Sequence, residues 1–371
     1  MKTFFLTIFG LYILANAYVG YSLWQIIPAN LIVRITMLSL LAVGFVAPII
    51  FFAFGESLNI STAGFLYKVG TSWMIAFLYL FIFILLIDIF KLSAHIIGYV
   101  SKDTIHEIFS HNGITSIIIF GFTSLLLIAG NINYHNKKRV HLPIISNKID
   151  KPMRIVAVSD LHLGYTIGKK ELAKWVTLIN DEKPDMVLIA GDLIDNQLRP
   201  VLYQSMHEEL QKIYAPLGIY ACTGNHEFIS GIKESANFYK SAKIHLLRDS
   251  HLEVNSINIV SRDDHSRHNR TELAEIVKDI DNSRFTILLD HQPSNIDAAV
   301  KSGIDLQLSG HTHHGQIFPV SLVTKKLFEV SHGYKQKGNT QIYVSSGLGI
   351  WGGKFRIGTQ SEYVVIDLTN E

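Results

Sequence analysis

Five short clusters of carboxylate, amide and imidazole residues recur along the second half of the sequence. They are Asp160-Leu161-His162, Gly191-Asp192-Leu193-Ile194-Asp195, Gly224-Asn225-His226-Glu227, the single His291, and Gly310-His311-Thr312-His313. Each cluster follows an apolar, β-branched run, so each is predicted to lie at the end of a strand. Oxygen and imidazole ligands from several strand ends are what a two-metal hydrolytic site requires. The pattern therefore predicts a metal-dependent phosphoesterase.

Each cluster alone also has an ordinary explanation. Asp-x-His is common in loops, and Gly-Asp-x-x-Asp is often no more than a turn. The Gly-His-Thr-His run is more specific, because alternate residues of an extended segment point to the same side and can share a metal. All five clusters in this order, each after a strand-like run, favour a common metal site.

Strand-like and helix-like segments alternate from Met153 to the end of the sequence. This alternation predicts an α/β domain in which helices cover a sheet. Sheets of this kind bind ligands at the loops that leave the carboxyl ends of their strands. The predicted strands are 153–159, 186–190, 218–223, 257–261, 285–289, 306–308, 342–346 and 363–368, and the predicted helices are 169–180, 202–213, 232–242 and a segment after Pro293.

The first part of the sequence is much more apolar than the rest. It contains four stretches of about the 20 apolar residues that a bilayer span needs, at 4–27, 31–54, 72–100 and 114–132. We therefore expect an all-α transmembrane domain of four helices over residues 1–132. A polar, basic segment at 133–152 reads as a juxtamembrane linker, and the catalytic domain is expected at 153–371.

Charge and cysteine content exclude several classes of protein. From Lys151 onward, 24 Lys and Arg face 26 Asp and Glu, which argues against a dedicated nucleic-acid binder. The single cysteine, Cys222, excludes an intrachain disulfide and a thiolate-rich metal site. In the short loops next to the predicted spans, five Lys and Arg would lie on one side of the membrane and three on the other. Because basic loops are usually cytoplasmic, this difference favours a cytoplasmic catalytic domain.

Together the clusters resemble the signature of the calcineurin-like metallophosphoesterases over residues 153–369. Finer features at 289–293, 315–316 and 345–349 resemble a bacterial membrane-associated branch. Some members of that branch act on UDP-diacylglucosamine, a precursor of lipid A. The resemblance implies a two-sheet sandwich flanked by helices (αββα) in a protein of the bacterial inner membrane. His314 is a departure, because this branch often has Gly or Asn at that position.

The resemblance also implies a role for each site residue. One metal would be bound by Asp160, His162, Asp192 and His313, and the other by Asp192, Asn225, His291 and His311, so that Asp192 bridges the two ions. A water or hydroxide between the metals would attack phosphorus, and His226 would act as the catalytic residue that stabilises the transition state or protonates the leaving oxygen. Asp195 and Glu227 would orient the ligands. Such ligands suit Mn²⁺, Fe or Zn²⁺.

Three further segments are candidates for contact with substrate. Residues 316–330 carry apolar side chains beside Lys325 and Lys326, and could meet a lipid with an anionic headgroup or form a packed cap. Arg356 could clamp a phosphate or be an ordinary surface residue, and His314 is expected at the rim. The hydrophilic loop 263–270 is expected to be solvated.

Three functions remain open at this point. The first is a membrane-anchored phosphodiesterase or pyrophosphatase acting on a lipid or nucleotide-lipid substrate. The second is a membrane-tethered phosphomonoesterase or nucleotide phosphodiesterase with a soluble phosphorylated substrate. The third is a membrane sensor that binds metal or nucleotide without catalysis.

Overall fold

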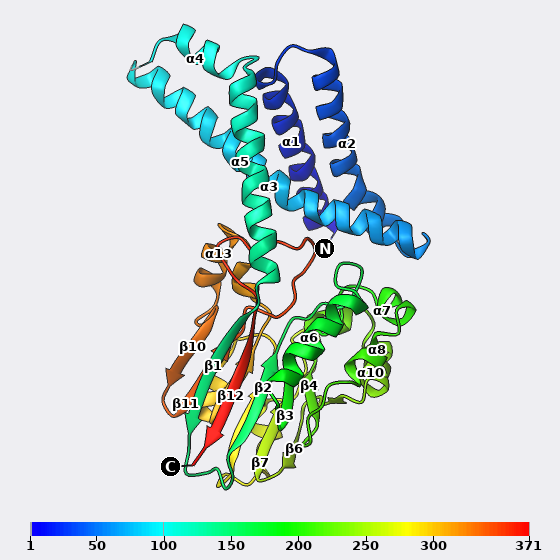
Figure 1. The fold of residues 1–371 in the computed structure, drawn as a ribbon. Helices are drawn as coiled ribbons and strands as arrows, with labels where there is room; N and C mark the ends of the chain where they lie inside the picture. Colours follow the sequence, from blue (N-terminus) through cyan, green and yellow to red (C-terminus); the bar gives the residue numbers. More distant parts are fainter. Residues whose placement is uncertain (1, 99, 371) are drawn as a thin grey trace. The chain divides into compact units, whose positions relative to one another are not determined.

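The computed structural model describes residues 2–98 and 100–370, without the side chains of residues 2–5 and 8. The chain forms two compact units, Met1–Ala129 and Gly130–Glu371 (Figure 1). We call them the membrane unit and the catalytic unit. The helices of the first are α1 (Lys2–Ile26), α2 (Leu31–Phe54), α3 (Ile60–Ile97), α4 (Lys102–Phe109) and most of α5 (Gly113–His135).

Among the described residues, three helices are long and apolar enough to cross a membrane, namely α2, α3 and α5. They confirm three of the four predicted spans. The fourth, 4–27, is helical as α1, but its first residues lie partly outside the described side chains, and it is not among the three candidates. Two of the candidates begin at an asparagine N-cap, where Asn30 and Asn59 accept hydrogen bonds from the first backbone N–H groups.

The catalytic unit contains two six-stranded mixed sheets. The first has the order β1-β12-β2-β3-β4-β5 and the second the order β10-β11-β9-β8-β7-β6 (Figure 1). The strands are β1 (Lys138–Ile145), β2 (Met153–Val158), β3 (Met186–Ala190), β4 (Ile219–Cys222), β5 (His245–Leu246), β6 (Ser250–Val254), β7 (Ile257–Ser261), β8 (Phe285–Leu289), β9 (Leu306–Ser309), β10 (Gly333–Lys337), β11 (Thr340–Val344) and β12 (Glu362–Thr369).

Short helices connect these strands. They are α6 (Lys169–Asp181), α7 (Arg199–Tyr203), α8 (Met206–Leu210), α9 (Asn225–Ile229), α10 (Ile232–Ser241), α11 (Leu273–Ile276), α12 (Ile296–Lys301), the 3-10 turn η1 (His313–Gly315) and α13 (Val320–Leu327). The predicted helix 202–213 is divided into α7 and α8. The predicted helix 169–180 is α6, in which buried apolar residues recur at helical spacing, namely Leu172, Trp175, Val176 and Ile179.

Apolar side chains form a layer between the two sheets and further layers on their outer faces. Ile155 and Leu188 of the first sheet lie in one cluster with Ile259 and Ile287 of the second. On the outer side of the first sheet, a separate cluster joins the strands to α6, α8 and α10. A third cluster packs α11 and α12 against the second sheet. The prediction of an α/β domain built from sheets and covering helices is thus confirmed.

The predicted linker 133–152 is wrong over residues 138–145, which form strand β1. This strand runs parallel to β12, with Lys138 opposite Glu362 and Ile145 opposite Thr369. Leu142 and Ile144 point into the core while their neighbours are exposed, so the segment alternates as a half-buried strand does. Pro143 is tolerated because β1 is an edge strand, where a missing N–H costs no ladder bond.

The end of α5 is part of the catalytic unit. The Asn133 side chain donates hydrogen bonds to the backbone oxygens of Arg356, at 3.0 Å, and Thr359. The Arg356 backbone N–H in turn donates to the Gly130 oxygen at 2.9 Å. The Tyr134 hydroxyl donates to Glu171 of α6 at 2.6 Å. The last residues of a candidate membrane span are therefore fixed within the catalytic unit.

We predict that Ile144→Ala destabilises the catalytic unit by about 2–5 kcal/mol, the usual cost of emptying a buried aliphatic site. Ile145→Ala is the matched control, because this neighbour on the same strand is 68% exposed while Ile144 is 1% exposed. Thermal or denaturant unfolding of the full chain measures the difference. Equal effects of the two substitutions would contradict the assignment of β1 to the sheet.

Candidate metal centre

The five clusters lie at the ends of strands that are neighbours in the two sheets. In the first sheet, Asp160 follows β2, Asp192 follows β3 and Asn225 begins α9 after β4. In the second sheet, His291 follows β8 and His311 follows β9. Because β2, β3 and β4 are parallel to one another, as are β8 and β9, their carboxyl ends meet at one edge of the sandwich. The predicted placement at strand ends is confirmed.

Asp160, His162 and His313 form the first group of possible ligands, and their ligand atoms all lie within 4.8 Å of one another. The Nε2 atoms of the two histidines are 3.0 Å apart. His313 Nε2 lies 3.5 Å from Asp160 Oδ1. Two imidazole nitrogens and a carboxylate that converge in this way are typical ligands of a divalent transition metal.

Asp160, Asp192 and His291 form a second such group. His291 Nδ1 lies 2.8 Å from the Ala190 carbonyl oxygen, so Nδ1 carries the proton and Nε2 keeps its lone pair for a metal. That Nε2 lies 3.2 Å from Asp192 Oδ2 and has no hydrogen-bond partner among the described residues. Nearby, His311 Nδ1 lies 2.9 Å from Asn225 Oδ1, which brings the remaining two predicted ligands together.

Asp192 lies between the two sets of ligands, as a bridging carboxylate must. Its Oδ2 is 3.7 Å from His162 Nε2 of the first set and 3.2 Å from His291 Nε2 of the second. Burial alone would raise the pKa of Asp192, but without a metal the charge of a protonated His291 outweighs burial and holds the pKa well below its usual value. The ionised carboxylate is the form that can bridge two cations.

Two of the candidate histidines are held neutral. Burial and the neighbouring His291 lower the pKa of His311 to about 4. Burial and the neighbouring His162 lower the pKa of His313 well below its usual value. Neutral imidazole is the form that binds metals. The donor set, its burial and the neutral form of these two rings therefore fit divalent cations. At His291 burial opposes the charge of Asp192, which raises the pKa of the ring well above its usual value, so a metal bound there would displace a proton.

The backbone of this region is strained where it presents the ligands. Asp160, His162, Asp192, His311 and His313 all have φ between 47° and 68°, in the left-handed region that non-glycine residues seldom adopt. Such strain concentrates at functional sites, where the surrounding fold maintains it. The motif glycines permit the close packing, since a Cβ on Gly224 would collide with Asp192 and one on Gly310 with Asp160.

The left-handed conformation also corrects the expected geometry of Gly310-His311-Thr312-His313. The segment is not extended, because His313–Gly315 forms the 3-10 turn η1 and His314 has a φ of 52°. Its two histidines nevertheless reach the same site, since His311 contacts Asn225 and His313 contacts His162 and Asp160. A turn, rather than strand alternation, brings them there.

Asp195 lies between a ligand and the predicted catalytic histidine. Its Oδ1 is 3.6 Å from His162 Nδ1 and 3.5 Å from His226 Nδ1. The ring of His226 packs edge-on against His162, with centroids 4.5 Å apart, and its backbone N–H donates to Asp192. Burial, followed by the neighbouring His162, lowers the pKa of His226. These contacts place His226 beside the metal ligands.

Glu227 is fully buried and connects two of the motifs. Its carboxylate accepts backbone hydrogen bonds from Asp192 at 3.1 Å, Ile194 at 3.1 Å and Gly224 at 2.7 Å. Three donors from two different loops hold the loops in a fixed relation. Glu227 thus positions the Gly-Asp-x-x-Asp loop against the Gly-Asn-His-Glu loop, as its predicted supporting role requires.

Arg356 is not an exposed phosphate clamp, and that prediction is wrong. Its side chain is fully buried, and its guanidinium donates hydrogen bonds to five protein oxygen atoms at 2.5–3.4 Å. The acceptors are the backbone oxygens of His313, Ser346, Gly347 and Gly349 and the Ser361 hydroxyl. With its donors engaged in this way, the guanidinium supports the backbone of a ligand instead of meeting substrate.

His314 follows the candidate ligand His313 in the sequence, but its ring contacts His332. Its ring stacks on His332, with centroids 4.4 Å apart and planes 6° apart. His332 Nε2 in turn lies 3.2 Å from the Glu362 carboxylate. Burial and the neighbouring His332 lower the pKa of His314 to about 4. It is partly exposed beside the site, and a role in binding substrate stays a prediction.

The loop expected to be solvated, 263–270, is in fact partly buried. Asp263 and Asp264 are buried, and Asp264 accepts a hydrogen bond from Gln292 at 2.8 Å. Arg270 pairs with Asp290, the residue before His291. Sequence reasoning missed this supporting network. The only available signal was the adjacency of Asp290 to a candidate ligand, because charged runs are usually solvated.

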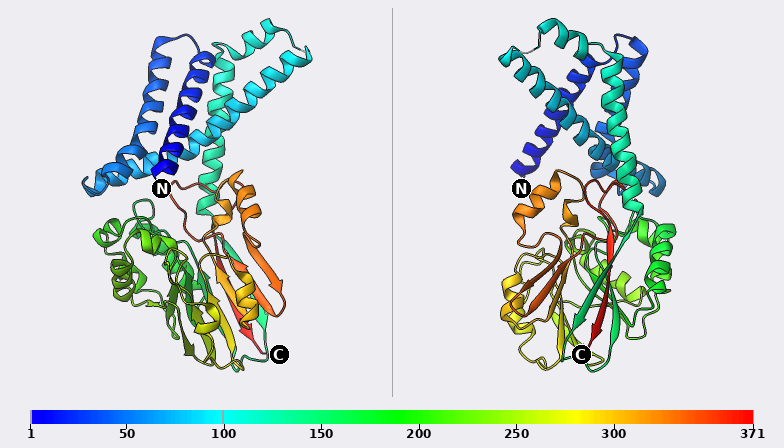
Figure 2. Two further views of the ribbon diagram at one scale, coloured as in Figure 1. Left: turned by 180° about the vertical axis from the view of Figure 1, so that it is seen from behind. Right: turned by 60° about the vertical axis from the view of Figure 1, so that its left-hand side comes forward.

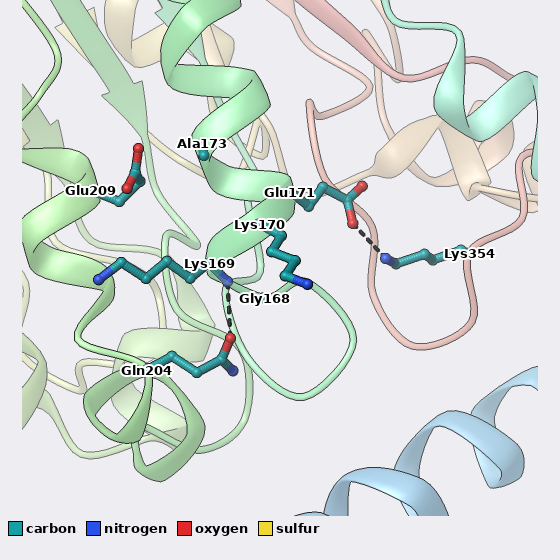
Figure 3. Close-up of a pocket in the computed structure, with 8 residues that line it drawn as sticks. All are labelled: Gly168, Lys169, Lys170, Glu171, Ala173, Gln204, Glu209 and Lys354. Carbon is teal, nitrogen blue, oxygen red and sulfur yellow. Dashed lines mark hydrogen bonds and ion pairs between the residues drawn. The ribbon is translucent and has the colours of Figure 1, made fainter.

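A separate cavity of about 620 Å³ lies at the start of α6 (Figure 3). It is lined by Gly168, Lys169, Lys170, Glu171, Ala173, Gln204, Glu209 and Lys354. None of the predicted site residues lines it. Glu171 is paired with Lys354 and with the Tyr134 hydroxyl, so part of this wall helps to join α5 to the catalytic unit.

The chain is similar in sequence to known proteins. A family model for calcineurin-like phosphoesterases matches residues 153–315. An uncharacterized metallophosphoesterase of Campylobacter jejuni is 36% identical over 255 residues, which are 66% of this chain and 67% of the relative. The chain belongs to the calcineurin-like metallophosphoesterase family. Membership implies divalent metal ions, which agrees with the ligand groups described above.

Two further relatives extend the comparison. An uncharacterized metallophosphoesterase of Helicobacter pylori (strain J99) is 38% identical over 232 residues, which are 61% of this chain and 62% of the relative. A transmembrane protein with metallophosphoesterase domain from Danio rerio is 31% identical over 274 residues, which are 68% of this chain and 62% of the relative. The chain therefore spans less than two thirds of the length of these two relatives.

We predict that Arg356→Lys destabilises the catalytic unit and reduces its retention of metal. A single ammonium group cannot replace all the bonds of the guanidinium, and each buried carbonyl left without a donor costs about 1–3 kcal/mol. Arg139→Lys is the control, because Arg139 forms an exposed pair with Glu182, which is worth little. Thermal unfolding and elemental analysis would detect the loss, and unchanged values for Arg356→Lys would contradict it.

Proposed function

We propose that the protein is a membrane-anchored binuclear metallophosphoesterase that hydrolyses a phosphodiester or pyrophosphate bond. The observation that carries this proposal is the position of Asp192 between two sets of buried ligands, 3.7 Å from His162 and 3.2 Å from His291. Two divalent cations, Mn²⁺, Fe or Zn²⁺, would neutralise charge on the phosphoryl oxygens and lower the pKa of a water nucleophile there. The remaining chemical steps are assigned to side chains of the protein.

His226 is proposed as the catalytic residue. It is close to the ligands without belonging to either proposed set, so its imidazole is available for a substrate oxygen. Asp195 would orient the ring through Nδ1, since the two atoms are 3.5 Å apart, and leave Nε2 to face the leaving oxygen. Burial lowers the pKa of His226, which makes the protonated ring a stronger acid toward that oxygen and reduces the fraction of the ring that is protonated.

We further propose that the substrate is an amphiphilic phosphate held in the membrane, with a nucleotide-lipid such as UDP-diacylglucosamine as one example. The support is the three candidate spans in the same chain, of which α5 is continuous with the catalytic unit. A simple tether needs only one span. The basic residues Lys137, Lys138 and Arg139 directly after α5 favour a bacterial inner-membrane protein with its catalytic unit in the cytoplasm.

We predict that Asp192→Asn and His226→Ala both abolish most phosphoesterase activity but differ in metal content. Asp192→Asn removes the charge shared by both ions, so bound metal falls together with activity. His226→Ala removes proton transfer, with a loss of about 10²–10⁴-fold in kcat, and should keep its metal. His268→Ala, which changes an exposed histidine in another loop, is the control.

The assay should follow phosphate release by the full chain in lipid nanodiscs and elemental analysis of the same samples. Comparing a lipid-linked pyrophosphate with a soluble phosphodiester separates the lipid enzyme from a tethered enzyme of soluble substrates. Metal binding without turnover of either substrate would favour a sensor. Full activity of Asp192→Asn would refute the binuclear assignment.

A further inference from the structure

Helix α13 presents an apolar face to solvent directly after the last metal ligands. Val320, Val323 and Leu327 recur at the spacing that places residues on one face of a helix, and Leu327 is 71% exposed while Val323 is 55% exposed. Ser321, on the opposite face, is buried. Phe318, just before the helix, and Leu322, on another side of it, are also exposed. A packed cap would bury these side chains, so it does not describe α13, whereas Ile317 and Val330 on either side of the helix are buried as a cap requires.

Basic residues accompany the apolar face. Lys325 and Lys326 lie in the last turn of α13 and are exposed. In the described part of the chain, no acidic side chain forms an ion pair with either lysine. The nearest acidic residue along the chain, Glu329, pairs with Lys335 and Lys337 instead. A short helix with an apolar face and free lysines is typical of a segment that lies in the headgroup region of an anionic bilayer.

The position of α13 within the catalytic unit points to the same partner. The Phe318 N–H, just before the helix, donates to the Ile357 carbonyl at 2.8 Å. On its other side, the 356–359 loop is bonded to Gly130 and Asn133, which belong to the end of candidate span α5. One short loop therefore separates the start of α13 from the residues where a membrane span ends. Figure 2 shows α13 at the end of the catalytic unit opposite the end of β12.

Helix α13 is also tied to the metal ligands at both ends. At its start, Gly315 of η1 packs so tightly against Ser321 that a Cβ there would collide with the helix backbone. At its end, the ring of Phe328 packs edge-on against that of His311, with centroids 6.1 Å apart. The Thr312 hydroxyl donates to the Ser331 oxygen at 2.6 Å. The helix cannot move far without moving His311 and His313.

We propose that α13 is a docking surface for an anionic lipid bilayer, with Val320, Val323 and Leu327 among the acyl chains and Lys325 and Lys326 at the phosphates. The docked helix would hold the metal centre at the depth of the lipid headgroups. The surface would thereby select phosphates borne by membrane lipids over phosphates in free solution. This consequence, though not the docking itself, rests on the proposed function.

Site-directed spin labelling of the full chain in nanodiscs tests the docking. The only native cysteine, Cys222, is buried, so Leu327→Cys provides a single accessible labelling site. Ile145→Cys is the control, because Ile145 is also well exposed (68%) but lies at the end of β1, opposite Thr369 and away from the ligands. Collision of the label with oxygen, which concentrates in lipid, is compared with collision with a water-soluble nickel chelate.

We expect the ratio of oxygen to nickel collisions to be severalfold higher at position 327 than at position 145 in nanodiscs that contain phosphatidylglycerol. The ratio at 327 should fall in pure phosphatidylcholine, and it should fall likewise when Lys325→Gln and Lys326→Gln are added in phosphatidylglycerol. A ratio at 327 equal to that at 145 would refute docking. A label shielded from both reagents would show that α13 packs against protein, which also refutes it.

The measurement requires no turnover, so it separates the two proposals. A label immersed in lipid on a chain that hydrolyses nothing would refute the proposed function and leave the docking surface standing. Hydrolysis by a chain whose label at position 327 stays in water would refute the docking surface and leave the proposed function standing. A ratio at 327 that is high and insensitive to lipid charge would remove the lysines from the proposal.

Discussion

The burial of two carboxylates in one small region is the constraint on which the rest of the catalytic unit depends. Asp160 and Asp192 are 0% and 2% exposed, and no lysine or arginine forms an ion pair with either among the described residues. Two uncompensated charges would be too costly to bury. The positive groups that compensate them are imidazoles, such as His291 beside Asp192, and the buried Arg356, which interacts electrostatically with Asp160. Imidazoles are also good metal ligands in their neutral form, so bound protons and divalent cations are alternative ways to compensate these carboxylates.

This constraint explains why the surrounding backbone is so unusual. The candidate ligands come from five loops around the two carboxylates, and several of them have a left-handed backbone. Hydrogen bonds from two buried side chains stabilise this strained backbone. Glu227 fastens two loops through backbone N–H groups, and Arg356 fastens the His313 backbone to the loops that contain Ser346 and Gly349. Both supporting groups are ionisable and fully buried, so their hydrogen bonds are also needed for stability.

Much of this arrangement is predictable from sequence, because parallel strands bring their carboxyl ends to one edge. That rule was enough to gather Asp160, Asp192 and His291, which are more than 30 residues apart from one another. Helix α6 was predictable from its apolar spacing. Strand β1 was not, because an edge strand with alternating exposure and a proline looks like a linker until its partner β12 is known. Arg356 was misassigned for a related reason. A sequence shows the charge of a guanidinium but not which carbonyl oxygens surround it.

Arg356 also connects the site to the end of α5. Arg356 donates from its side chain to the His313 carbonyl, while its backbone bonds with Gly130 and Asn133 at the end of α5. Arg356 thus links the end of a candidate span to the backbone of a candidate ligand, one through its main chain and the other through its side chain. The 356–359 loop also holds the start of α13, through Ile357 and Phe318. Since the end of α5 and the start of α13 both meet this loop, the same hydrogen bonds inside the catalytic unit hold these two segments and the His313 backbone in one framework.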